Sequence, residues 1–181
     1  MSNDSVTMKA SVFIATSVDG FIARKDGSID WLPVEDPDED YGYREFIDTV
    51  DAIVMGRNTF ESVFSMDIWP YENKPVIVLS HRQLTIPPKI NKQVKVMSAA
   101  PVLLVAELAQ LGYRHLYVDG GITIRSFLND GLISQLIITR IPILIGSGIP
   151  LFGPLARDIR LRHLLTRQYE NGLVQSRYEV L

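Results

Sequence analysis

Three short segments of the sequence combine residue types that suit phosphate groups, and each follows an apolar run. They are Gly120-Gly121, Gly56-Arg57-Asn58-Thr59 and Ser80-His81-Arg82. Glycine has no Cβ, so a ligand can come close to the backbone there. Arginine offers a planar fork to phosphate oxygens, and serine adds a hydroxyl donor. The three segments together predict an anion-binding site.

A helical pattern begins directly behind Gly120-Gly121 and runs over residues 122–130. The first turn of such a helix has unpaired N–H groups and the positive end of the helix dipole, which both favour a phosphate. A strand-to-helix turn without any ligand is the alternative, because short glycine motifs also occur by chance. The other two segments favour the ligand.

A dinucleotide that carries a 2′-phosphate needs two anion sites, one for its pyrophosphate and one for that phosphate. Gly120-Gly121 suits the pyrophosphate, and Arg57 with Ser80, His81 or Arg82 suits the second site. No acidic residue stands where a ribose 2′-hydroxyl would need an acceptor. The sequence therefore favours NADP(H) over NAD(H).

These segments must be brought together by a sheet. Strands are predicted where buried runs occur, and helices lie between them. In a parallel sheet the carboxyl ends of the strands meet at one edge, which is where ligands bind. The predicted strands cover residues 9–15, 51–57, 74–80, 94–97 and 116–119, and the predicted helices cover 41–49, 58–63, 101–111 and 122–130.

The C-terminal part reads differently. Asn171-Gly172 separates two segments at 160–169 and 174–180, which predicts a β-hairpin. Pro142 lies inside the apolar run 133–145, which indicates a bulge or an edge strand. The fold class is therefore α/β, with a mostly parallel sheet and an antiparallel C-terminal hairpin.

Composition limits the possible functions. The chain has 181 residues, of which 46% are hydrophobic, so we expect one domain over 9–181 after an extended or disordered segment at 1–8. The net charge of −3 argues against nucleic-acid binding, and no apolar run is long enough to span a membrane. The absence of cysteine and the presence of only three histidines make a metal site improbable. We expect a cytoplasmic protein, because no signal peptide pattern is visible.

Three further residues of reactive type are assigned no chemistry. Asp19 is expected to form an Asx-type turn with Gly20. His115 and His163 have no motif around them, so we interpret both as structural or surface residues.

The phosphate-type motifs resemble those of a known superfamily. Residues 54–62 look like the Met-Gly-Arg-x-Thr-aromatic-Glu-Ser motif of dihydrofolate reductases. Residues 76–82 resemble the Ile-Val-Leu-Ser strand end of those enzymes, and Asp119-Gly120-Gly121 is similar to their Gly-Gly turn. The resemblance implies a dihydrofolate reductase-like fold of three layers.

A closer resemblance within this superfamily extends over essentially the whole chain from residue 9. Residues 17–23, 119–121, 131–133 and 142–152 resemble the reductase domain of the bacterial bifunctional riboflavin-biosynthesis deaminase–reductase, and most of all its stand-alone bacterial relatives. The family default is 5-amino-6-(5-phosphoribosylamino)uracil reductase activity with NADPH. Dihydrofolate reduction is the alternative activity. A nucleotide-binding domain without turnover, or a purely structural domain, is the alternative from another class.

The resemblance also implies roles for individual residues. Backbone groups of Ala15 and Ile22 would meet the nicotinamide, and the peptide bond of the glycine pair is often cis in the family. Homodimers are common, and the run 132–145 would form the paired face. The pyrophosphate would lie on Gly120, Gly121, Ile122 and Thr123, and the adenosine side on Gly56, Arg57, Thr59, Leu79, Ser80, His81 and Arg82.

A reductase of this kind must also deliver a proton, from water or from a carboxyl group with a raised pKa. Asp30 is the first candidate, because the neighbouring Trp31 would exclude water; a turn or cap role is the alternative. Asp40 is the second, with a role as helix N-cap as the alternative. Trp31, Tyr43 and Arg44 are the candidates for substrate contact, and core or surface positions are their alternatives.

Overall fold

The structure is a computed structural model that describes residues 8–33, 39–65, 69–71 and 73–181. The extended or disordered segment expected at 1–8 lies almost entirely outside the described residues. Within them no helix is long and apolar enough to cross a membrane.

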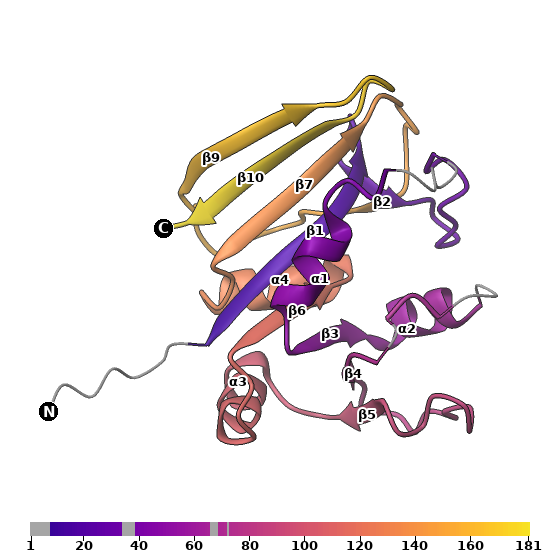
Figure 1. Ribbon diagram of the computed structural model, residues 1–181, viewed down its shortest axis with the longest axis vertical. Helices are drawn as coiled ribbons and strands as arrows, with labels where there is room; N and C mark the ends of the chain where they lie inside the picture. Colours follow the sequence, from indigo (N-terminus) through magenta and orange to yellow (C-terminus); the bar gives the residue numbers. More distant parts are fainter. Residues whose placement is uncertain (1–7, 34–38, 66–68, 72) are drawn as a thin grey trace, which may run out of the picture.

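An eight-stranded sheet organises the described part of the chain, in the order β5-β4-β3-β6-β1-β7-β10-β9 (Figure 1). The first six strands are parallel, and the last two are antiparallel. The elements are β1 Lys9–Ser17, β2 Phe21–Ala23, α1 Tyr43–Thr49, β3 Ala52–Gly56, α2 Arg57–Phe64, β4 Val76–Leu79, β5 Val94–Met97, α3 Pro101–Gln110, β6 His115–Asp119, α4 Gly121–Asn129, β7 Gln135–Ile141, β8 Ile149–Pro150, β9 Leu161–Gln168 and β10 Val174–Val180.

The parallel strands are short, apolar and buried on both faces, which is typical of a sheet covered by helices on two sides. Residues Ala52 to Met55 of β3 have no exposed surface. Phe46 of α1 and Phe60 of α2 pack on one face of the sheet. Leu104 of α3 and Phe127 of α4 pack on the other face. The three layers and the predicted α/β class are confirmed.

The first strand along the chain lies in the middle of the sheet. Residues 9–11 of β1 pair with β6, and residues 11–17 pair with β7. His115 supports this centre, because its Nε2 lies 2.8 Å from the Ser11 hydroxyl and its Nδ1 lies 2.9 Å from the Thr49 carbonyl oxygen. The interpretation of His115 as a structural residue is therefore confirmed.

The C-terminal half corrects two expectations. The Asn-Gly hairpin is present, since β9 and β10 pair on either side of it. Pro142, however, follows the end of β7 rather than interrupting it, and β7 is paired on both edges. Four of the seven residues of β7 are buried, so this strand contributes to the core. Leu144, which follows it in the run 132–145, is 70% exposed. Strand β9 carries three of the exposed apolar side chains, since Leu161, Leu164 and Leu165 are 41–49% exposed.

Candidate active site

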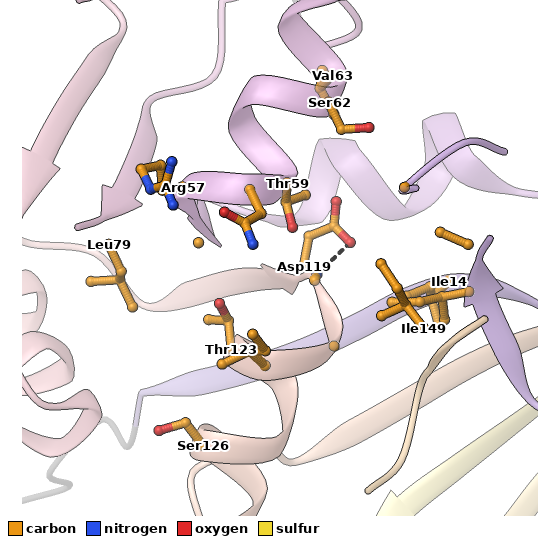
Figure 2. A pocket seen from close by; sticks show the side chains of 18 of the residues that line it. Ile14, Arg57, Thr59, Ser62, Val63, Leu79, Asp119, Thr123, Ser126 and Ile149 are labelled. Atoms are coloured by element: carbon orange, nitrogen blue, oxygen red, sulfur yellow. Dashed lines mark hydrogen bonds between the residues drawn. The ribbon is translucent and has the colours of Figure 1, made fainter. Parts of the chain in front are cut away.

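A cavity of about 630 Å³ opens at the carboxyl ends of β1, β3, β4 and β6. Residues from all three phosphate-type segments line it, and Figure 2 shows Arg57 and Thr59 of one segment on the same side of the cavity as Asp119. Of the residues predicted to bind a cofactor, all but Arg82 line it: Ala15, Ile22, Gly56, Arg57, Thr59, Leu79, Ser80, His81, Gly120, Gly121, Ile122 and Thr123. Motifs that are far apart in the sequence thus form one site.

Thr59 lies so close to position 120 that only glycine fits there. Gly120 has a φ of +88°, which disfavours any residue with a side chain. A Cβ added to it would lie 2.2 Å from the Thr59 hydroxyl oxygen. The first turn of α2 therefore rests directly on the turn between β6 and α4. The peptide bond between Gly120 and Gly121 is trans, in contrast to the expected cis form.

The neighbouring glycines are also closely approached. A Cβ on Gly121 would lie 3.0 Å from the carbonyl oxygen of Pro150 and 3.2 Å from Cδ1 of Ile22. A Cβ on Gly56 would lie 3.1 Å from the Thr123 hydroxyl oxygen. These contacts leave the backbone itself as the wall of the cavity, which allows a ligand to reach N–H groups.

Two helices begin at this wall, and neither has a side-chain cap. α2 starts after Gly56 and α4 after Gly120, and among the residues that the structure describes no side chain caps either start. Free N–H groups at a helix start, together with the helix dipole, attract anions. Both helix starts are therefore suited to an anion.

The predicted 2′-phosphate site is partly supported. The guanidinium of Arg57 lines the cavity and donates to Glu61 at 3.0 Å. Ser80 forms a local turn with the backbone of Arg82, and His81 Nδ1 lies 2.5 Å from the Ser98 hydroxyl. Arg82 is exposed and does not line the cavity. The predicted role of Arg82 therefore finds no support in the geometry.

The cavity also holds a carboxyl group that the sequence analysis did not select. Asp119, the last residue of β6, is half-buried and lines the cavity beside Thr59 (Figure 2). Burial raises the pKa of Asp119 to about 6, although hydrogen bonds from the Gly120 N–H and the Tyr71 hydroxyl favour the carboxylate. The same burial raises the pKa of Tyr71 and of Tyr117. Such a carboxyl group can hold or release a proton near neutral pH.

Asp30, the first predicted proton donor, has a different environment. Its carboxylate accepts from Arg24 Nε at 2.6 Å, and its side chain is 63% exposed. The hydrogen bond from Arg24 lowers the pKa of Asp30, so the group stays ionised at neutral pH. Asp30 also does not line the cavity. The geometry argues against a catalytic role and favours the alternative of a turn residue.

The second candidate, Asp40, holds the start of α1. Its carboxylate accepts from the backbone N–H groups of Gly42 and Arg44, both at 2.9 Å. The bond from the Arg44 N–H is the first cause of the lowered pKa of Asp40. The alternative interpretation as a helix cap therefore describes Asp40 better than catalysis.

The three predicted substrate contacts lie outside the cavity lining. Trp31 is 7% exposed and packs with Ile141 and Leu173 in a small core of its own. Tyr43 packs edge-to-face on Phe13, at 5.6 Å between ring centres, and Phe13 itself lines the cavity. Arg44 is exposed. These positions match the alternatives given for all three residues.

The roof of the cavity is a two-stranded sheet of β2 and β8, which bring Ile22 and Ile149 to the lining. Asp19 fixes this roof, because its carboxylate accepts from the N–H groups of Ile145 and Gly146 at 3.3 and 2.8 Å. The expected Asx-type turn is wrong, since Ser17 Oγ accepts the Phe21 N–H instead.

Several residues of the cavity were missed by the sequence analysis. Asp119 was read only as part of a glycine motif, although its place at a strand end next to Gly120-Gly121 was a usable signal. Tyr117 lies two residues before Asp119 and therefore on the same face of β6. This spacing could have identified it as a cavity residue. Asn58 and Ser62 line the cavity from α2. Both belong to motifs named above, but neither was given a role of its own.

The fold and the site define a dihydrofolate reductase-like protein. A dihydrofolate reductase from Enterococcus faecalis, solved in complex with NADP(H) and RAB-propyl, superposes with a TM-score of 0.65 at 17% identity, over 96% of each chain. The chain belongs to the RibD C-terminal domain family, which matches residues 9–175.

Two further solved structures are similar to this chain. One is described as "Putative riboflavin biosynthesis protein" from Shewanella sp. PV-4; it is 41% identical with a TM-score of 0.90, over 96% of this chain and 99% of the other. The second is the Thermotoga maritima diaminohydroxyphosphoribosylaminopyrimidine deaminase/5-amino-6-(5-phosphoribosylamino)uracil reductase. It is 13% identical with a TM-score of 0.72, over 97% of this chain and 57% of the other. The resemblance to the reductase domain of the family is thereby confirmed.

Proposed function

We propose that this protein is an NADPH-dependent reductase of a pyrimidine- or pteridine-like small molecule. The observation that carries the proposal is the single cavity in which two uncapped helix starts, Arg57 and a protonatable Asp119 meet. The family and the solved structures, one of which is a reductase and another an NADP(H) complex, support the same activity.

The residues present fit the cofactor. The backbone N–H groups at the start of α4 suit its pyrophosphate, and those at the start of α2 with Arg57 suit its 2′-phosphate. Ile22 and Ile149 of the apolar roof line the same cavity and would exclude water from the nicotinamide end. When bound, the cofactor supplies a hydride to the substrate.

Asp119 is the residue of this chain that can complete the reduction. A carboxyl group with a pKa of about 6 is partly protonated at neutral pH, so its oxygen can hold the proton that the substrate must gain. The N–H of Gly120 donates to Oδ1 at 2.7 Å, which orients the group toward the cavity (Figure 2). Asp119 therefore replaces Asp30 as the candidate proton donor.

The family default, 5-amino-6-(5-phosphoribosylamino)uracil reduction, is the first activity to test, and dihydrofolate reduction is the second. Oxidation of NADPH, followed at 340 nm, tests both. Quenching of tryptophan fluorescence by NADPH tests cofactor binding by itself. Binding without oxidation by any pyrimidine or pteridine would favour a nucleotide-binding domain without turnover. A failure to bind NADPH would contradict the proposal.

We also propose that the protein forms a homodimer, as the family resemblance implies. The exposed leucines of β9 form the apolar part of the sheet edge that such a dimer would cover. Light scattering after size exclusion should give twice the chain mass, and Leu164→Glu should give the monomer. A monomeric wild-type protein would contradict this proposal.

A further inference from the structure

A second cavity of about 570 Å³ lies beside the first, between the turn after β2 and residues 58–65 of α2 and its C-terminal end. The two cavities adjoin each other, because five residues line both: Gly27, Ile29, Asn58, Ser62 and Ile149. A ligand whose ring occupies the first cavity can therefore extend a substituent into the second.

The second cavity differs from the first in its chemistry. Most of its lining residues have polar side chains, among them Lys25, Asn58, Ser62 and Ser65. The Lys25 amine, the Asn58 amide and the Ser62 hydroxyl form no hydrogen bond within the part of the chain that the structure describes. Donors and acceptors without a protein partner are available to a polar ligand.

The charges in the second cavity do not favour an anion. One cation, Lys25, stands with two carboxylates, Asp26 and Glu61. The hydrogen bond from the Ser28 N–H lowers the pKa of Asp26, so it is ionised at neutral pH. Glu61 forms an ion pair with Arg57 at 3.0 Å. A cofactor phosphate bound to Arg57 would neutralise the guanidinium charge and leave the Glu61 carboxylate without its cation. Hydroxyl groups, which both donate and accept, match this mixed lining better than a phosphate does.

We infer that the second cavity binds an uncharged, hydroxyl-rich arm of the substrate, a sugar or polyol attached to the ring, and disfavours a phosphorylated arm. The inference rests on the proposed function, because it needs the ring in the first cavity. It names the substrate class more closely: a ring with a free polyol arm is a better ligand than the same ring with a phosphate at the end of that arm.

Calorimetry in saturating NADP⁺ tests the inference without turnover, using three uracils as probes. They are 5,6-diaminouracil, the same ring with a ribityl arm on the 6-amino group, and that arm with a terminal phosphate. The ribityl arm should lower the Kd at least tenfold, since two or more hydrogen bonds are gained. The phosphate should raise the Kd again by at least threefold.

Variants assign the effect to the cavity. The affinity gained from the ribityl arm is the Kd of 5,6-diaminouracil divided by the Kd of the ribityl compound. Lys25→Ala and Ser65→Ala should each reduce this ratio by about three- to tenfold. Asp26→Asn, which keeps an oxygen for the Ser28 N–H, should improve binding of the phosphorylated arm by at least threefold, but not of the free arm. Lys92→Ala removes an exposed lysine outside both cavities and is the matched control.

Each failure has its own signature. Two results would overturn the inference and leave the proposed function intact. One is equal Kd values for the three uracils. The other is tightest binding of the uracil with the phosphorylated arm, if Lys25→Ala abolishes the affinity that the phosphate adds. If no uracil binds, the ring preference of the proposed function fails. Ribitol alone, followed by amide NMR shifts at residues 25–29 and 58–65, then decides the arm site: shifts that Ser65→Ala abolishes support it, and their absence overturns it.

Discussion

Two regions supply the walls of the same cavity and differ in how their carboxyl groups are placed. At the tips of β3, β4 and β6, Asp119 is half-buried among tyrosines and its pKa is raised to about 6. In the segment between β2 and α1, Asp30 is exposed and bound to Arg24, and its pKa is lowered. Residue type alone therefore does not identify an acid catalyst, because the surroundings set the protonation state.

The largest expected difference between the two regions lies in catalysis. Asp119→Asn keeps the shape of the side chain but removes its proton, so kcat for NADPH oxidation should fall by about 10²-fold or more. Asp30→Asn, the matched control, should change kcat by less than about threefold. Stopped-flow hydride transfer with the best substrate measures both. A larger loss for Asp30→Asn would reverse the comparison.

The second difference concerns the cofactor. Arg57→Ala should weaken NADPH by about ten- to a hundredfold and NADH much less, since we propose that the guanidinium binds the 2′-phosphate. Arg82→Ala, outside the cavity lining, should leave the NADPH-to-NADH preference unchanged. Titration of both cofactors with each variant tests this expectation. Equal losses for NADPH and NADH in Arg57→Ala would contradict the assignment.

The third difference is steric. Gly120→Ala and Gly20→Ala both place a side chain at a φ near +85°, but only the first meets Thr59, and nothing lies within 4 Å of the second. Gly20→Ala should cost about 1 kcal/mol of unfolding free energy. Gly120→Ala should cost a further 1–3 kcal/mol or so, because the Thr59 hydroxyl must move. Urea denaturation of the two variants measures the gap, and equal costs would show that Thr59 relaxes freely.

The smallest expected effect is the pH dependence of stability. The pKa of Asp119 is higher in the folded protein, about 6, than the value of about 3.9 in an unfolded chain, so the folded state binds the proton more tightly. The contribution to stability is thus present at low pH and is lost as pH rises toward 6. Between pH 5 and pH 8, Asp119→Asn should gain about 1 kcal/mol relative to the wild type in urea denaturation. A constant difference across this range would mean that the pKa is not raised.

The strand-tip region could be predicted from sequence because its signals are local. Gly56, Arg57, Gly120 and Gly121 follow apolar runs, and parallel pairing then brings the ends of those runs to one edge. The protonation state of Asp119 could not be predicted, because it depends on burial and on Tyr71, which is 48 positions earlier in the chain. That information exists only once the strands and the segment after α2 have packed.

The segment before α1 was harder to interpret, because its acids form local contacts that leave no periodic signal. Asp30 pairs with Arg24, and Asp40 holds the start of α1. The hairpin around Asn171-Gly172 was predicted because turn chemistry is local. The pairing of β7 on both edges was not predicted, because Pro142 could equally follow a strand or lie within an edge strand.

The central place of β1 also has a consequence for how the chain acquires its structure. Its neighbours are β6 and β7, whose paired residues lie more than a hundred positions downstream. During synthesis the first strand must therefore wait, without its partners, until most of the polypeptide has left the ribosome. Long-range pairing of this kind makes folding slow and leaves an apolar segment open to aggregation in the meantime. Shielding of residues 9–17 in nascent chains is therefore expected to govern the yield of native protein.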